Sequence, residues 1–226
     1  MVHLMFDLLA AALAFQAIRL THAWAPSTTE PPAFRPAYSM ALVLGAVLGA
    51  YCLGTLNLWL SGLPGIGRSI LGALAGSIVA VELYKALTGI KGSTGALFVP
   101  GFALAIAIGR VGCFLSGLPD NTHGIPTTLP WGHDFGDGIQ RHPVQLYESA
   151  AMAAFFLFSL WLLARRPAAF QARAFYLMVL FYAAQRFGLE FLKPYAPVLG
   201  PLNLFHIVTA ALALYAALML ARSRHA

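Results

Sequence analysis

The chain has 226 residues, of which 59% are hydrophobic and only 10% are charged, and its mean hydropathy is +0.74. Soluble domains carry about 25% charged residues, so this composition excludes an ordinary soluble protein and indicates an integral membrane protein. The formal net charge of +6 fits basic residues that face anionic lipid of the inner leaflet, and we expect no nucleic-acid partner.

Seven stretches are long and apolar enough to cross a bilayer, because a transmembrane helix needs about 20 mostly apolar residues. In chain order they are residues 4–20, 38–60, 68–88, 95–117, 144–164, 174–192 and 201–221. Most loops between them are short. We therefore predict an all-α integral membrane protein with about seven transmembrane helices in one bundle, a single polytopic domain over residues 1–226.

The distribution of basic residues predicts the orientation of the chain, because cytoplasmic loops are enriched in Lys and Arg. One side of a seven-span chain holds three of them, Arg68, Arg141 and Lys193. The other side holds nine, namely Arg19, Arg35, Lys85, Lys91, Arg165, Arg166, Arg173, Arg222 and Arg224. This bias predicts an N-terminus outside and a C-terminus inside.

Two connections are longer than the others. Residues 21–37 are rich in Pro, Ser and Thr and should form an irregular cytoplasmic loop. The other loop, about residues 118–143, faces outward by the charge count and exceeds the about 12–15 residues usual for a loop without secondary structure. Its apolar residues favour a functional segment that packs back onto the bundle or the interface; they are Ile125, Leu129, Trp131 and Phe135.

Two arginines interrupt apolar stretches, Arg110 within residues 99–115 and Arg186 within residues 175–192. An ionised side chain at bilayer depth costs roughly 2.5–3.5 kcal/mol, so each arginine needs a buried partner or a polar ligand. The planar fork of a guanidinium matches phosphate oxygens. Because the commonest phosphate in a membrane is a lipid head group, the two arginines predict a phospholipid site.

Other polar residues fall in the same outer half of the predicted bundle. Gln145 and Glu148 share one face of the fifth span, and Tyr182, Arg186 and Glu190 form one stripe on the sixth. Arg186 and Glu190 are four residues apart and can pair within their helix. A purely structural role for this pair, and for a pair between Arg110 and Glu148, stays open on the sequence alone.

Three motifs on successive spans carry a family resemblance: GRVGCF (109–114), RHPVQLYE (141–148) and QRFGLEF (185–191). Together they resemble the prolipoprotein diacylglyceryl transferase family, over roughly residues 64–221. The resemblance implies a multi-pass enzyme of the bacterial inner (plasma) membrane with its active site towards the periplasm. Such an enzyme transfers the diacylglyceryl group of phosphatidylglycerol to the lipobox cysteine thiol of a preprolipoprotein, or here to another acceptor. We expect no cofactor and no metal.

The resemblance also implies roles for individual residues. Arg110 and Arg186 would contact the head group and act in catalysis, with Glu190 as the partner of the second arginine. His142 and Glu148 are further catalytic candidates. The remaining candidates for phospholipid binding are Gln145, Tyr147, Tyr182 and Gly112.

The chain departs from the family pattern at several positions. The family has Asn in place of Cys113, Asn in place of Ser116 and Glu near Leu118. Its His-Gly-Gly element on the third span is replaced by Leu-Gly-Ala at residues 71–73, which removes the histidine proposed to assist thiol activation. The resemblance therefore supports phosphate recognition better than the complete reaction.

Thiol activation would then need another base, from His142, His123 or His133, or a cationic site that ionises the thiol. The same three histidines with the loop aspartates could instead hold the metal of a hydrolase. Their spacings of ten and nine residues fit no standard helix-borne zinc pattern.

Two further hypotheses remain. Cys113 could form an acyl-enzyme with a nearby histidine as base. Alternatively, the chain could be a non-catalytic or differently acting membrane protein that binds phospholipid head groups through Arg110 and Arg186. Turnover of labelled phosphatidylglycerol separates such a protein from an enzyme.

The predicted orientation can be tested with alkaline phosphatase fused at Ala226 or near Asn121. Because this reporter is active only outside the cytoplasm, we expect activity near Asn121 and none at Ala226. Activity at Ala226 would reverse the topology.

Overall fold

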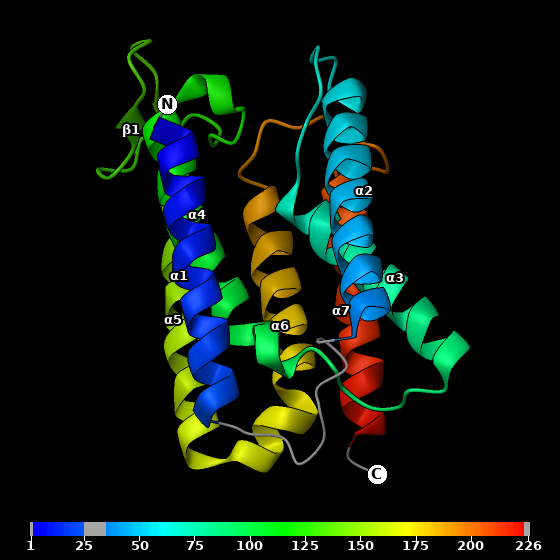
Figure 1. The fold of residues 1–226 in the computed structure, drawn as a ribbon. Helices are drawn as coiled ribbons and strands as arrows, with labels where there is room; N and C mark the ends of the chain where they lie inside the picture. Colours follow the sequence, from blue (N-terminus) through cyan, green and yellow to red (C-terminus); the bar gives the residue numbers. More distant parts are fainter. Residues whose placement is uncertain (1, 25–34, 224–226) are drawn as a thin grey trace. The chain divides into compact units, whose positions relative to one another are not determined.

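The computed structural model describes residues 2–24 and 35–223, and most of them are helical (Figure 1). Seven α-helices appear in this part of the chain: α1 (Val2–Trp24), α2 (Pro36–Leu60), α3 (Ile70–Thr88), α4 (Val99–Ser116), α5 (Val144–Arg165), α6 (Pro167–Glu190) and α7 (Leu204–Arg222). Two 3-10 turns flank α4, η2 (Ala96–Phe98) and η3 (Leu118–Asp120). A short antiparallel hairpin, β1 (His133–Asp134) with β2 (Gln140–Arg141), lies in the loop before α5.

Each predicted span corresponds to one of these helices, so the all-helical membrane fold is confirmed. Six of the helices in the described residues are long and apolar enough to cross a membrane. The exception is α6, which carries the polar stripe that ends at Glu190. The orientation stays a prediction.

Part of the predicted cytoplasmic loop, residues 21–37, is helical. Residues 21–24 continue α1, and α2 begins at Pro36. Residues 25–34 lie outside the described residues.

The chain divides into two compact units. The first unit comprises residues 1–26 and 95–194 and holds α1, α4, α5, α6 and the hairpin. The second comprises residues 27–94 and 195–226 and holds α2, α3 and α7. The prediction of a single domain stays a prediction, and each unit is described by itself.

In the second unit, α2 and α3 cross closely at glycines. A Cβ on Gly49 would lie 2.2 Å from the carbonyl oxygen of Gly72, and a Cβ on Gly45 would lie 2.5 Å from that of Gly76. Small residues at such a crossing let two membrane helices approach at backbone distance. Gly72 lies in the segment where the resemblance led us to expect a histidine, and it serves helix packing here.

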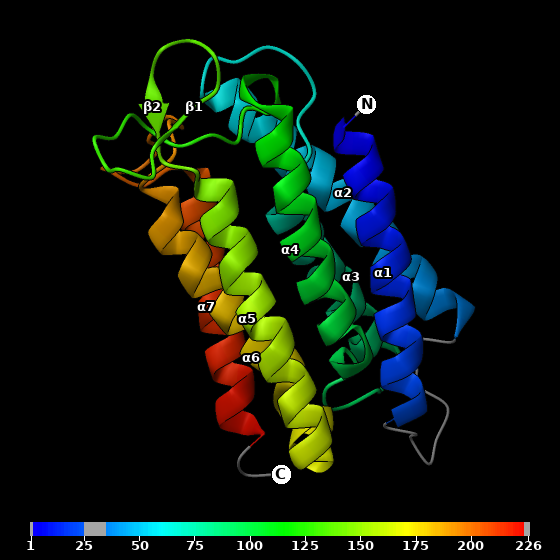
Figure 2. The ribbon, with the colours of Figure 1, turned by 90° about the vertical axis from the view of Figure 1, so that its left-hand side faces the viewer.

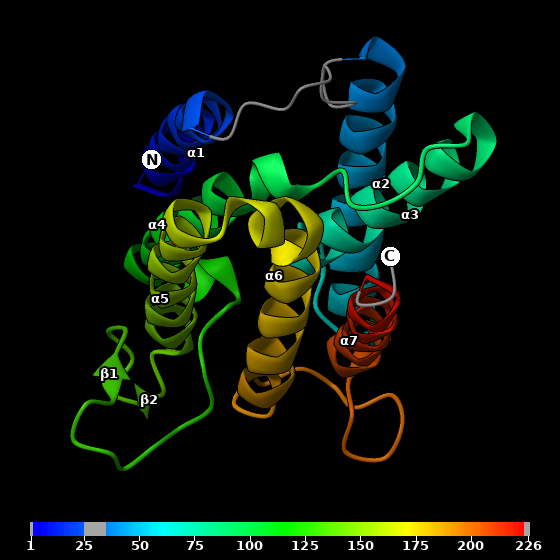
Figure 3. The same cartoon turned by 90° about the horizontal axis from the view of Figure 1, so that it is seen from below.

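In the first unit, α4 lies between α1 and α5, and α5 lies beside α6 (Figures 2 and 3). Two glycines three helical turns apart on α4 face α1. A Cβ on Gly112 would lie 2.5 Å from the Cβ of Phe6, and one on Gly101 would lie 2.8 Å from the carbonyl oxygen of Ala14. Gly112 thus has a packing role, while its assignment to phospholipid binding stays a prediction.

We expect Gly112→Ala to destabilise the protein, because the added methyl group has no room beside Phe6. Overpacking of this kind typically costs about 1–3 kcal/mol, so the melting temperature of the purified protein in detergent should fall.

Gly188→Ala on α6 is the matched control, since nothing lies within 4 Å of a Cβ at that position. Alanine is favoured over glycine in a helix by roughly 1 kcal/mol, and this variant should melt at the same temperature or higher. Equal melting of both variants would contradict the close packing of α1 on Gly112.

Candidate functional site

The polar centre of the first unit is the carboxylate of Glu148 on α5, whose side chain is fully buried. Its oxygens pair with cations from three places in the chain. Arg110 Nε of α4 lies 2.5 Å from Oε2, and Arg186 Nη1 of α6 lies 2.5 Å from Oε1. Lys193 Nζ, just beyond the end of α6, lies 2.7 Å from Oε1. One carboxylate therefore connects α4, α5 and the end of α6.

A second carboxylate completes this group. Glu190 Oε2 lies 3.0 Å from Nε of Arg186, one helical turn away on α6. Tyr182, a turn before Arg186, is also fully buried, and its ring packs edge-on against Phe102 of α4. The predicted stripe on α6 thus faces the buried site.

The charges of this group do not cancel. Three cations and two carboxylates leave a formal excess of one positive charge, and none of the five side chains is more than 6% exposed. Burying an uncompensated charge is costly. Both ion pairs expected from the sequence are present, yet they leave a net cationic site that favours an anion.

Lys193 is the member of this site that the sequence analysis missed, because it was assigned to a loop in the topology count. It is 5% exposed and lies three residues after Glu190, whose carbonyl oxygen accepts a hydrogen bond from its backbone N–H. Burial and the nearby Arg186 lower the pKa of Lys193 to about 8. The ammonium is therefore mostly protonated at neutral pH. Its spacing of one helical turn from Glu190 was the available signal.

Gln145, at the first turn of α5, is fully buried, as expected of a site residue. Its Nε2 donates a hydrogen bond to Oγ1 of Thr122 over 3.3 Å. Its Oε1 is buried without a hydrogen-bond partner in the described part of the chain. An unsatisfied buried acceptor of this kind suits a ligand hydroxyl.

His142 and Tyr147 interact with each other and with the loop before α5. Nδ1 of His142 lies 3.4 Å from the hydroxyl of Tyr147, and that hydroxyl accepts a hydrogen bond of 2.8 Å from Nε1 of Trp131. These contacts hold the loop against the start of α5. A catalytic role for His142 and a lipid-binding role for Tyr147 stay predictions.

The loop itself packs back onto the first unit, as the sequence predicted. The backbone N–H of Ile125 donates to the carbonyl oxygen of Leu192, just past α6, over 2.8 Å. Phe135 packs on Phe114 at the end of α4. At its tip, Arg141 pairs with Asp137 and lowers the pKa of that exposed carboxyl to about 2.

The three loop histidines do not come together. His133 packs between Phe114 and Phe135, while Nδ1 of His123 lies 3.2 Å from the carbonyl oxygen of Gly124. Within residues 2–24 and 35–223, none of the three belongs to a group of three potential metal ligands. This arrangement gives no support to the hypothesis of a hydrolase metal held by these three histidines.

A profile described as prolipoprotein diacylglyceryl transferase matches residues 10–222, nearly the whole chain. The chain belongs to this family. It is a multi-pass membrane protein of that family, as the three motifs predicted.

Several relatives are named phosphatidylglycerol–prolipoprotein diacylglyceryl transferase. The protein of Clostridioides difficile strain 630 is 34% identical over 146 residues, which cover 64% of this chain and 56% of the relative. That of Cupriavidus necator is 32% identical over 180 residues, 73% of this chain and 63% of the relative. That of Clostridium tetani is 39% identical over 140 residues, 57% and 53%. The chain spans about half the length of the curated relatives it matches. No solved structure matches it.

Proposed function

We propose that this protein transfers the diacylglyceryl group of phosphatidylglycerol to a cysteine thiol of a prolipoprotein, at the periplasmic side of the bacterial inner membrane. The observation that carries the proposal is the buried excess of positive charge around Glu148. The family and the names of its relatives supply the chemical class. The phosphate of the lipid head group is the anion that this site would hold.

The reaction is an alkylation of sulfur. A thiolate attacks the glyceryl carbon, a carbon–sulfur bond forms, and the carbon–oxygen bond to the phosphate breaks. The electron pair leaves on the phosphate of glycerol phosphate, which gains negative charge. Arg110 and Arg186 would stabilise that charge, because fixed cations act strongly where water is excluded. Gln145 Oε1 would accept a hydrogen bond from a hydroxyl of the glycerol head group.

The cluster also restricts how the arginines can act. Glu148 pairs with Nε of Arg110 and with Nη1 of Arg186, and Glu190 pairs with Nε of Arg186. These contacts orient the two guanidiniums in advance. Preorganised donors need no rearrangement as the leaving group departs, and the two glutamates would therefore act as positioning residues.

One observation favours the alternative, a protein that binds phospholipid without turning it over. At residues 71–73 the family histidine is absent, Leu71 is 1% exposed, and Gly72 packs on Gly49. Residues 71–73 therefore contain no side chain that could take the proton of the acceptor thiol. The cationic site would still bind a head group in such a protein.

We expect Arg110→Lys or Arg186→Lys to abolish transfer from labelled phosphatidylglycerol to a lipobox peptide. Lysine keeps the charge but loses the bidentate fork, and a buried phosphate site should sense that difference. Melting in detergent should show that the variants remain folded.

His133→Ala is the control for these two variants, since His133 is exposed, packs on Phe114 and Phe135, and takes part in none of the ion pairs around Glu148. It should change turnover little. Normal turnover by both lysine variants would remove the arginines from the mechanism. Binding of the lipid by the unmodified chain without any turnover would instead support the non-catalytic alternative.

Binding of phosphatidylglycerol should weaken as the pH rises through and above 8, the pKa region of Lys193. An anion prefers the protonated ammonium, so the affinity is fully present at lower pH and declines as that proton is lost. A bound phosphate would itself move the midpoint upward. Binding of a fluorescent analogue on both sides of this pH would measure the effect.

Lys193→Arg is the control, because a guanidinium stays protonated throughout this range. If it folds and binds, its affinity should lack the decline. An identical decline in this variant would show that Lys193 is not the titrating group.

A further inference from the structure

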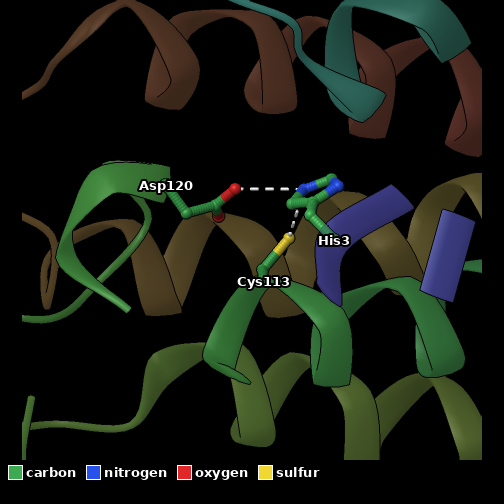
Figure 4. A group of neighbouring side chains, drawn as sticks. All are labelled: His3, Cys113 and Asp120. Carbon is green, nitrogen blue, oxygen red and sulfur yellow. Dashed lines mark hydrogen bonds and ion pairs between the residues drawn. The ribbon is translucent and has the colours of Figure 1, made fainter. Parts of the chain in front are cut away.

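A second polar group lies at the C-terminal end of α4, on the side that faces α1. It consists of His3 from α1, Cys113 from α4 and Asp120 from η3 (Figure 4). The three potential ligand atoms all lie within 4.8 Å of one another. It is the one group of this kind in residues 2–24 and 35–223. Cys113 lies within the motif GRVGCF, but the proposed mechanism uses none of the three residues.

The packing of α1 on α4 creates this group. Phe6 lies on Gly112 and Ala14 lies on Gly101, so the two helices run antiparallel in close contact. This register places His3, about one turn before Phe6, beside Cys113, the residue after Gly112. The chain then reverses at Gly117, whose φ of +71° suits a glycine, and η3 carries Asp120 back to His3.

The geometry of the group fits a metal ion. Nε2 of His3 lies 3.7 Å from Sγ of Cys113 and 3.0 Å from Oδ1 of Asp120. Tetrahedral zinc with ordinary bond lengths would set nitrogen and sulfur about 3.6 Å apart and nitrogen and oxygen about 3.4 Å apart. Small side-chain adjustments would bring all three atoms into its coordination sphere.

The other ring nitrogen of His3, Nδ1, pairs with the carboxylate of Asp7. Nδ1 lies 2.9 Å from Oδ2 of Asp7, one turn along α1. A carboxylate on the second nitrogen is typical of metal-binding histidines, because it fixes the ring and leaves the first nitrogen unprotonated. With Nδ1–H donating to Asp7, the lone pair of Nε2 would face the sulfur and the Asp120 carboxylate. In this tautomer three electron-rich atoms converge on one point, an arrangement that a bound cation would stabilise.

We propose that His3, Cys113 and Asp120 bind a divalent cation of the zinc class, with Asp7 orienting His3. A set of thiolate, imidazole and carboxylate suits zinc, and three protein ligands leave one position open, as in catalytic zinc sites. The side chains of His3 and Asp120 are 29% and 12% exposed, so a fourth ligand can approach from their side.

The open position suggests what the cation does, and this step rests on the proposed transfer function. Nη1 of Arg110 lies 4.0 Å from Sγ of Cys113, so the cation site adjoins the phosphate-binding group. A thiol that binds the cation loses its proton to water and becomes a thiolate. That sulfur then forms its bond to the glyceryl carbon as the phosphate leaves with the electron pair. The cation would replace the base that is missing at residues 71–73.

Cobalt provides a direct test, because cobalt bound to a thiolate absorbs in the near ultraviolet. The full chain, stripped of metal in detergent, should bind one equivalent of Co²⁺ with this band, and Zn²⁺ should displace it. Cys113→Ser should lose the band, while Cys52→Ser, which removes the exposed cysteine of the second unit, should keep it. Asp7→Asn should weaken Co²⁺ binding about 10- to 100-fold.

Absence of the band in the unmodified chain, or its persistence in Cys113→Ser, would overturn the site. Rapid alkylation of Cys113 by iodoacetamide in the metal-free chain, without cobalt binding, would point instead to a nucleophilic cysteine with His3 as its base. Because these measurements use neither phospholipid nor prolipoprotein, a negative result would overturn the metal site without bearing on the proposed function.

If the site binds metal, removal of the metal should lower the rate of lipid transfer at least about ten-fold. An unchanged rate would overturn the role of the cation in thiol activation.

Discussion

The first unit depends on one physical constraint: a carboxylate buried in an apolar protein must be surrounded by cations. Glu148 meets this requirement with Arg110, Arg186 and Lys193, which come from α4, α6 and the residues just after α6. Because removing one partner of a buried pair leaves an uncompensated charge, the positions of these three elements are coupled through a single side chain. The helices cannot shift independently without breaking this group.

A buried cluster of ion pairs contributes little to the free energy of folding by itself. Buried ion pairs can often be replaced by apolar side chains of similar volume without loss, and sometimes with a gain. The group around Glu148 moreover has a formal excess of one positive charge, which is costly to bury without a counter-ion. A ligand with a phosphate would relieve that cost. A structural role and the proposed binding role are therefore compatible, because the contacts that hold the helices would also orient the arginines for a phosphate.

Helix α4 links the two polar groups of the first unit. One face presents Arg110 to Glu148, and another face, against α1, presents Cys113 to His3. The two residues are three apart, close enough for the guanidinium to approach the sulfur. Cys113 is also one of the positions where the resemblance led us to expect a departure from the family pattern. In this chain the thiol of Cys113 has the imidazole of His3 and the carboxylate of Asp120 as neighbours.

Much of this protein follows from local features of the sequence. The lengths and hydropathy of the apolar stretches predicted all seven helices, since a membrane span requires about 20 residues whatever its neighbours are. The cost of a charge in the bilayer marked Arg110 and Arg186 as site residues, and the four-residue spacing within α6 predicted the pair of Arg186 with Glu190. Each of these inferences uses only residues that are close together in the sequence.

The tertiary structure decided which polar side chains share a site. The sequence places Lys193 in a loop. In the structure its ammonium donates a hydrogen bond to the carboxylate of Glu148, 45 positions earlier. His3 and Cys113 are 110 positions apart, and no periodicity connects them. They meet because Gly112 has no side chain to hold Phe6 away, which sets the register between α1 and α4. Local patterns determine the helices, whereas the convergence of their side chains depends on how closely and in what register the helices pack.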